Sequence, residues 1–118
     1  MTTKRVILEM GSGADLHGGD YTKAARRAVE DALRHSSLSF IRTLGVDKDS
    51  LEVNVTIGVQ QPDKVDGEAL KSAFPVGQVK VTSVLGGLDS YDEAIGDFAV
   101  IAAAAIEVRM PAIWPTTA

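Results

Sequence analysis

The side chains best able to do chemistry lie together between residues 9 and 23. Asp15 and His17 are two residues apart, and a carboxylate that orients an imidazole gives a general acid or base that works near neutral pH. Lys23 adds a positive charge beside them if its face of the following helix meets a neighbouring chain. We therefore predict Asp15, His17 and Lys23 as the catalytic residues. The alternative is that Asp15 binds turn amides and His17 is simply exposed, because Asp and Gly are common in turns.

Glycines on both sides of Asp15 suggest a second chemistry, the binding of phosphate at a helix N-terminus. The spacing argues against the nucleotide motifs, because position 16 is leucine where a third glycine is needed and no lysine directly follows Gly18 and Gly19. We retain a more general set of predicted ligand-binding residues, which comprises Glu9, Gly11, Gly13, Asp20, Arg27, Gly86 and Gly87. Each has a structural alternative: an exposed strand residue, a turn glycine, a helix N-cap or part of a solvated helix face.

A strand and a helix must position the first group. Residues 6–10 alternate like a short strand, and the glycines from position 11 predict a loop. Asp20 is a suitable N-cap for a helix over residues 21–35. Small residues recur in that helix at three- and four-residue spacing and predict the face that packs on a sheet: Ala25, Ala28, Val29, Ala32 and Leu33.

The remaining elements follow from similar patterns. Residues 51–59 alternate strictly and predict a half-buried strand, Asp66 can cap a short helix over 67–74, and residues 78–85 predict a third strand. Residues 88–97 are polar and predict a connection. Residues 98–109 are apolar on both faces, which favours a central strand; their alanines leave a helix as the alternative.

The predicted order is β-α-β-α-β-β. We expect an α+β fold, with a single-layer mixed four-stranded sheet and helices on one face. The chain divides into one domain, residues 1–110, and a C-terminal tail, residues 111–118. One long and one short helix cannot cover both faces of such a sheet, so some surface needs another subunit and we expect a homo-oligomer.

The composition of the chain excludes some classes of binding partner and indicates where in the cell the protein is expected. The net charge of −4 argues against nucleic acid and anionic lipid as partners. The chain has no cysteine, which excludes disulfides, and no motif calls for a metal or cofactor. The longest apolar run is too short to span a bilayer and the first residues lack an apolar signal core, so we expect a cytoplasmic protein.

The loop and helix start also resemble a known family. The residues that carry the resemblance are Gly11, Gly13, Asp15, His17, Gly18, Asp20, Thr22, Lys23, Ala24, Arg27 and Ala28, with Gly86, Gly87 and the segment around Asp97. This pattern resembles a conserved-hypothetical family typified by a Listeria protein. The family brings no established activity with it.

The order of elements resembles the Bacillus chorismate mutase-like and YjgF-like folds, which are small mixed-sheet domains. Those proteins are often homotrimers with ligand sites between subunits, and the resemblance implies the same here. More loosely, the first strand, loop and helix resemble one repeat of the ring-opening amidohydrolases that act on cyanuric acid and barbiturate. Their lysine and serine are missing, because Gly11-Ser12 and Ile57-Gly58-Val59 stand at those places, so we do not expect a Ser/Lys mechanism.

The expected function is a cofactor-independent enzyme that binds a small molecule between subunits. A set of His, Asp and Lys suits hydrolysis or proton transfer on a small cyclic or imine-like substrate. The alternative is a non-catalytic small-molecule-binding or assembly protein in which the loop is structural.

Overall fold

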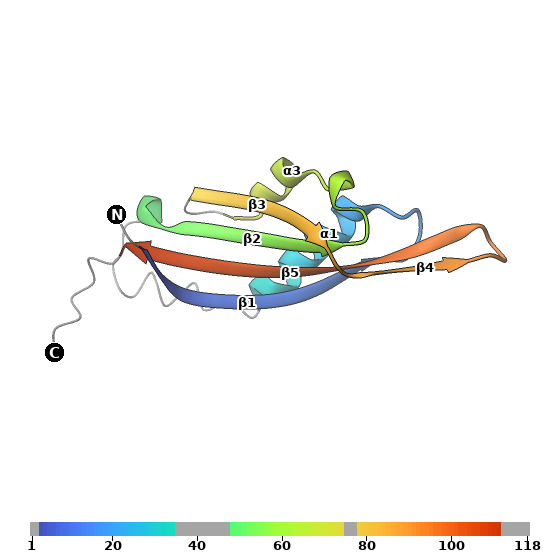
Figure 1. The fold of residues 1–118 in the computed structure, drawn as a ribbon, viewed down its shortest axis with the longest axis horizontal. Helices are drawn as coiled ribbons and strands as arrows, with labels where there is room; N and C mark the ends of the chain where they lie inside the picture. Colours follow the sequence, from blue (N-terminus) through green and yellow to red (C-terminus); the bar gives the residue numbers. More distant parts are fainter. Residues whose placement is uncertain (1–2, 35–47, 75–77, 112–118) are drawn as a thin grey trace.

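In the computed structural model, residues 3–34, 48–74 and 78–111 are described, and in them five strands form one open mixed sheet. Figure 1 shows the sheet with its long axis horizontal and with the helices packed on one of its faces. The elements in chain order are β1 (Thr3–Asp15), α1 (Tyr21–Arg34), η1 (Lys48–Ser50), β2 (Glu52–Val59), η2 (Pro62–Lys64), α3 (Gly67–Lys71), β3 (Gln78–Leu85), β4 (Leu88–Asp92) and β5 (Asp97–Pro111).

The sheet is built around β5, in the order β1-β5-β2-β3. Strands β2 and β3 are parallel, and β5 runs antiparallel to β1, β2 and β4. Pairing of β2 with β5 ends at Gly58 opposite Ala103, and β4 takes over with Leu88 opposite Ile101. The β4–β5 hairpin therefore prolongs the sheet beyond its other strands and projects as an arm (Figure 1).

The α+β class predicted from the sequence is confirmed, but the strand count of four was too low. The missing strand is β4, which lies in the segment predicted as a polar connection, residues 88–97. Only a narrow two-stranded arm is formed there, and most of the residues of β4 are exposed. The apolar alternation that marks a half-buried strand is therefore absent, and polar composition was a misleading guide.

Residues 98–109 lie within β5 and are strand, so the helical alternative was wrong. Burial alternates along this strand: Val100, Ala102 and Ala104 are buried, whereas Ile101 and Ala103 are exposed. The expected position at the centre of the sheet is confirmed. Among the described residues, however, only one face of the strand is covered by helices.

Strand β1 is much longer than the predicted 6–10, because Gly11 and Gly13 continue the ladder opposite Ala104 and Ala102. These glycines allow α1 to lie directly on the strand. A Cβ at Gly13 would come within 2.3 Å of the Ala28 backbone nitrogen, and one at Gly11 within 2.5 Å of the Ala32 nitrogen. The sequence pattern was interpreted as a loop, but the glycines serve close packing of helix on strand.

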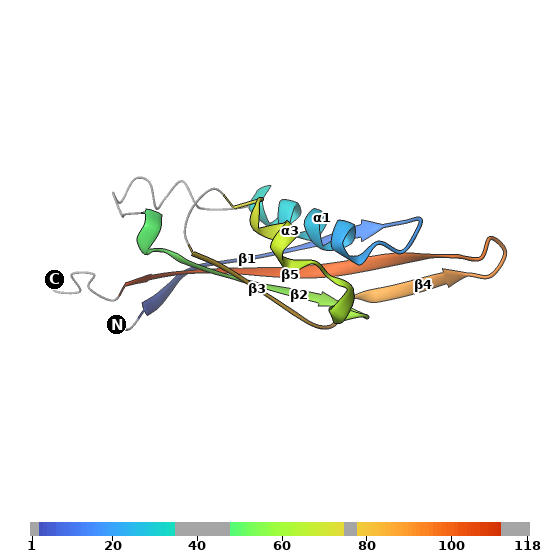
Figure 2. The same cartoon turned by 90° about the horizontal axis from the view of Figure 1, so that it is seen from above.

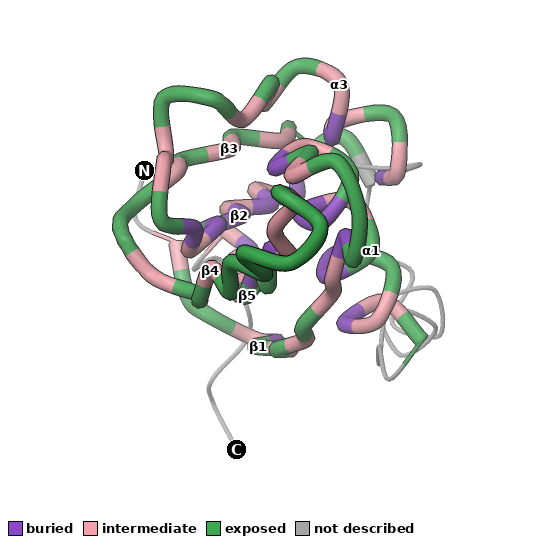
Figure 3. Tube along the Cα trace, turned by 90° about the vertical axis from the view of Figure 1, so that its right-hand side faces the viewer, coloured by how far each residue is buried: buried purple, intermediate pink, exposed green. Residues whose placement is uncertain are grey.

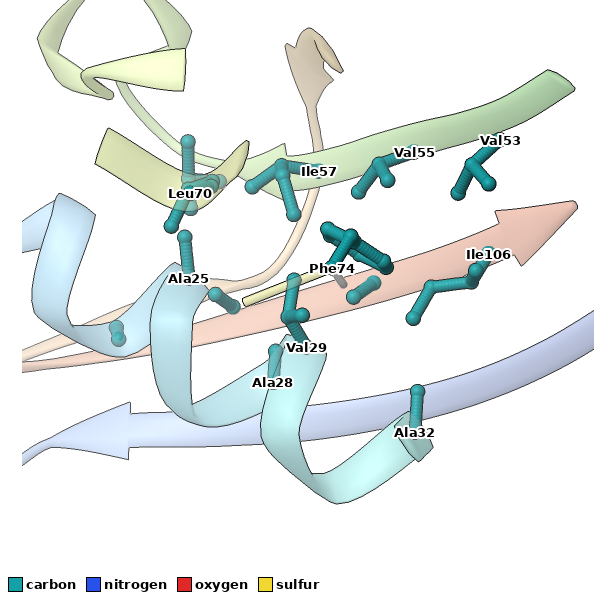
Figure 4. Close-up of a cluster of buried hydrophobic side chains, with 14 of the residues drawn as sticks. Ala25, Ala28, Val29, Ala32, Val53, Val55, Ile57, Leu70, Phe74 and Ile106 are labelled. Carbon is teal, nitrogen blue, oxygen red and sulfur yellow. The ribbon is translucent and has the colours of Figure 1, made fainter. Parts of the chain in front are cut away.

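The core lies between α1, α3 and the sheet, as Figure 4 shows. The predicted small-residue face of α1 is confirmed, and alanine side chains let the helix approach the strands closely. Leu70 of α3 and Phe74 fill the space between α1 and β2. The Asp66 side chain accepts a hydrogen bond from the Ala69 amide at 3.3 Å, which confirms the predicted cap, although α3 ends at Lys71 rather than at 74.

The opposite face of the sheet carries neither of these helices, as the view from above shows (Figure 2).

In the part of the chain that the structure describes, no helix is long and apolar enough to cross a membrane. Pro111, the first residue of the predicted tail, is the last residue of β5. The last predicted residue of the first helix, His35, and the rest of the predicted tail, residues 112–118, lie outside the described residues.

Candidate functional site

Asp15 is the last residue of β1 and the one buried charged residue among those described, with 3% of its surface exposed. Its Oδ2 accepts a hydrogen bond from the Asp20 amide at 2.8 Å. Its Oδ1 lies 3.6 Å from Lys23 Nζ and 3.9 Å from Arg27 Nη1, both on the first two turns of α1. The structure therefore brings together Asp15 and three other predicted site residues: Asp20, Lys23 and Arg27.

Two cations flank the Asp15 carboxylate. One buried carboxylate faces two cations, and the Lys23 and Arg27 side chains are about half exposed, at 52% and 48%. Arg27 Nη1 also donates to the Ala14 carbonyl oxygen at 2.6 Å, which fixes the guanidinium over the end of β1. The Asp20 carboxylate at the start of α1 is a second acid in this corner, so the charges balance overall. The exposed parts of Lys23 and Arg27 can still hydrogen-bond an anionic group of a ligand.

The carboxylate beside His17 is Asp97, not Asp15. His17 Nδ1 lies 3.4 Å from Asp97 Oδ2. Asp97 is the first residue of β5, eighty residues away in the chain, and spacing alone could not identify it. The only signal was its place in the segment that closes the family pattern.

Backbone amides hold Asp97 in its ionised form. Its Oδ1 accepts hydrogen bonds from the Gly18 amide at 3.0 Å and the Phe98 amide at 2.8 Å. These two bonds, and to a lesser degree His17, lower the pKa of Asp97. The ionised carboxylate faces Nδ1 of the ring, and the His17 side chain is 81% exposed. Nε2 is thus the nitrogen available to a substrate.

The loop that carries His17 is shaped by two glycines in the left-handed region. Gly18 has φ of +91° and Gly19 has φ of +61°, conformations that side chains rarely adopt. A Cβ at Gly19 would come within 2.2 Å of the Phe98 ring, so the loop lies directly on the start of β5. This contact and the Gly18 bond to Asp97 attach the loop to the arm near its hairpin turn.

Helix α1 begins beside this loop with a cap and a buried tyrosine. Asp20 Oδ1 accepts the Lys23 amide at 3.0 Å, which confirms the predicted N-cap. The Tyr21 hydroxyl donates to Asp89 Oδ2 of β4 and accepts from Gln61 Nε2 at 2.9 Å. Burial, and then the bond to Asp89, raises the pKa of Tyr21. Asp89 Oδ1 is buried and receives no hydrogen bond from the described residues.

Gly86 and Gly87 lie away from this corner. They form the turn from β3 to β4, where Gln60 Nε2 donates to both carbonyl oxygens, at 3.0 and 3.3 Å. Strand β4 and Asp15 lie on opposite sides of β5. Glu9 is six residues before Asp15, opposite Ile106 in the body of the sheet. The structure does not bring these three residues to Asp15 and His17.

The chemistry of the corner is that of charged hydrogen-bonding groups. Among residues 3–34, 48–74 and 78–111, no three His, Asp or Glu side chains are grouped so that they could hold a metal ion. What the corner offers is an imidazole held by a carboxylate and, on the adjoining helix, two cations.

Comparisons with known proteins agree on the fold and stop short of an activity. A family model described as a conserved hypothetical protein (Lin0512_fam) matches residues 5–108. A crystal structure of an FtsZ-like protein of unknown function from Nostoc punctiforme PCC 73102 is similar, with a TM-score of 0.81 and 31% sequence identity. That similarity covers 93% of this chain and 98% of the other. None of the curated proteins matches the chain.

Proposed function

The chain belongs to the Lin0512_fam family of conserved hypothetical proteins, and on that premise we propose that it is a cofactor-independent enzyme acting on a small molecule. The observation that carries the proposal is His17 Nδ1 at 3.4 Å from a carboxylate that two backbone amides keep ionised. In this reading His17 transfers a proton during hydrolysis or isomerisation of a small cyclic or imine-like substrate in the cytoplasm. Asp97 is its positioning residue.

An imidazole is the side chain that most readily exchanges a proton near neutral pH. A carboxylate at Nδ1 selects the tautomer with its proton on that nitrogen, which leaves Nε2 free to act as a base. Lys23 and Arg27 supply the complementary function, because their half-exposed cationic groups can bind an anionic group of the substrate. Asp15 keeps both cations in place.

The exposure of His17 supports a site that a second copy completes. An acid–base group gains most when water is excluded from the reacting atoms, and an 81% exposed imidazole lacks that environment in the single chain. We propose that a neighbouring subunit covers the loop and that the oligomer is a trimer, as in the chorismate mutase-like folds that the element order resembles.

The proposal is tested with paired variants and a panel of small carboxylates, cyclic amides and inorganic phosphate. Anions that bind raise the melting temperature of the wild type by mass action. Lys23→Ala removes that shift, whereas Arg34→Ala, which removes a cation from the far end of the same helix, retains it. His17→Ala abolishes turnover of any compound that the wild type converts, and Asp97→Asn shifts the pH profile of the rate. Turnover by His17→Ala equal to that of the wild type would overturn the assignment.

The exposure of His17 also favours a second candidate, a binding protein without catalysis. In that case Lys23 and Arg27 bind the anion and His17 is a surface residue. The same experiment separates the two: binding lost in Lys23→Ala, together with no turnover of the panel by the wild type, supports the binding protein.

A further inference from the structure

We infer that the sheet face opposite the helices is an interface on which a second copy of this chain packs. The inference depends on the proposed function only in requiring an oligomer, and it makes no use of His17. We call this surface the open face; its apolar and small residues are Leu8, Met10, Thr56, Gly58, Val84, Leu88, Ile101, Ala103 and Ala105.

The strand register places these residues on one side of the sheet. Alternate residues of β5 are buried under the helices, from Val100 to Val108, so Ile101, Ala103 and Ala105 point the other way. Met10 on β1 and Thr56 on β2 both lie opposite Ala105. Further members follow in the same way from the pairs Leu8 with Glu107, Gly58 with Ala103, Val84 with Gly58, and Leu88 with Ile101.

Large apolar side chains concentrate on this face. Nine are exposed among the described residues, and five of the nine belong to the open face: Leu8, Met10, Val84, Leu88 and Ile101. The most exposed of the five is Met10, at 66%. Single exposed apolar residues are ordinary, but a contiguous group on a soluble domain marks an interaction surface. The side chains at the centre of the face are small and project little from the sheet, which allows another sheet to pack about 10 Å away. These residues are Gly58, Ala103 and Ala105.

The area of the open face, taken with the arm, approaches that of a stable contact. Four strands about 4.8 Å apart and eight residues long cover roughly 500 Å² in projection. The β4–β5 arm lengthens that area, and side-chain relief adds to it. A standard interface needs about 800 Å² per partner, so the open face and the arm together approach that size.

Charge identifies the partner as another copy. At the end of the open face where β1 starts, the cations are Arg5, Arg109 and Lys80 and the acids are Glu107 and Glu52, which leaves one positive charge over. The arm at the opposite end carries four acids and no Lys or Arg between residues 88 and 97. One of the four, Asp89, bonds Tyr21 on the helix side and is not available to a partner. Figure 3 looks at this end of the molecule, where the hairpin is drawn as exposed. A nucleic acid or an anionic membrane would be repelled by the arm.

The two ends are complementary, so copies can pack head to tail. The acidic arm of one copy lies over the basic end of the open face of the next, and the apolar centres are buried between them. Each open face then covers the other, so this contact is isologous and a two-fold axis relates the two copies. Copies beyond this pair belong to the proposed function and not to this inference.

Light scattering and size-exclusion chromatography test the surface. The wild type elutes as a multiple of 12.5 kDa, and Met10→Arg or Ala105→Arg raises the dissociation constant about tenfold or more. Leu85→Arg is the matched control, because Leu85 is 72% exposed but lies in register with Val59, on the helix side of the sheet. Urea unfolding of each variant verifies the fold. A monomeric wild type, or dissociation by Leu85→Arg as strong as by Met10→Arg, would overturn the inference.

A charge-reversal cycle tests the head-to-tail arrangement. Lys80→Glu and Glu93→Lys each weaken the oligomer, and the double variant recovers part of the loss because opposite charges again meet. No recovery in the double variant refutes the arrangement. An oligomer that responds to Met10→Arg while His17→Ala leaves all chemistry unchanged supports the interface and refutes the proposed function, so the two can fail separately.

Discussion

Gly13→Ala should destabilise the protein severely, because the position of α1 depends on the absence of a side chain there. The new Cβ would lie 2.3 Å from the Ala28 nitrogen and 2.6 Å from the Arg27 carbonyl carbon. These neighbours are backbone atoms, and they fall about 1 Å short of the ordinary contact distance of about 3.5 Å. The helix must move or tilt as a body, and its alanine face then loses contact with β1 and β5.

The cost can be bounded. Overpacking in a core typically costs 1–3 kcal/mol, and a clash with backbone belongs at the upper limit, about 3 kcal/mol. That is a large part of the roughly 5–15 kcal/mol by which a domain is stable. For a chain of this length it corresponds to a fall in melting temperature of about 10 °C or more.

Urea and thermal unfolding measure the effect, with Gly67→Ala as the control. A Cβ at Gly67 would meet only Val81, at 3.4 Å, so that variant should remain within about 0.5 kcal/mol of the wild type. Gly13→Ala with a free energy of unfolding equally close to that of the wild type would refute the packing role. Gly13 could then again be a glycine selected for a ligand.

Two further changes have defined outcomes. Tyr21→Phe leaves Asp89 without its hydroxyl donor and should lower the free energy of unfolding by about 1–3 kcal/mol. Burial raises the pKa of Tyr21 in the folded state, so this residue contributes fully to the stability of the wild type below pH about 10, and the contribution is lost as the pH rises above that value. Tyr21→Phe should lack this alkaline loss of stability. If urea unfolding at several pH values shows parallel alkaline losses in both proteins, the reasoning is contradicted. Asp66→Ala removes the cap of α3 and should cost about 1 kcal/mol by the same measurement, while Glu68→Ala next to it should change little.

Local patterns predicted the parts of the fold that local forces determine. The face of α1 follows from helical spacing, and the caps Asp20 and Asp66 follow from residue type beside an apolar run. The strand β2 follows from strict alternation because one of its faces is buried. In each case a residue's preference and its final environment agree.

Long-range contacts decided what the sequence could not show. Gly11 and Gly13 have the composition of a loop, and only the pairing with β5 and the approach of α1 make them strand residues. The partner of His17 was equally hidden, because Asp97 reaches it through the register of the arm. Asp15 was found by spacing, but its partners Lys23 and Arg27 follow from where α1 lies on β1.

The central place of β5 has a consequence for how the chain folds. Among the strands that the structure describes, β1 pairs with β5 alone, and the contact joins residues about a hundred positions apart, such as Lys4 and Met110. Until residues 97–111 have left the ribosome, β1 and one edge of β2 have no strand to pair with. Contacts of such high sequence separation form slowly, and unpaired edges invite aggregation meanwhile. A nascent chain stalled before residue 97 should therefore need a chaperone, whereas one stalled well beyond Pro111 should not.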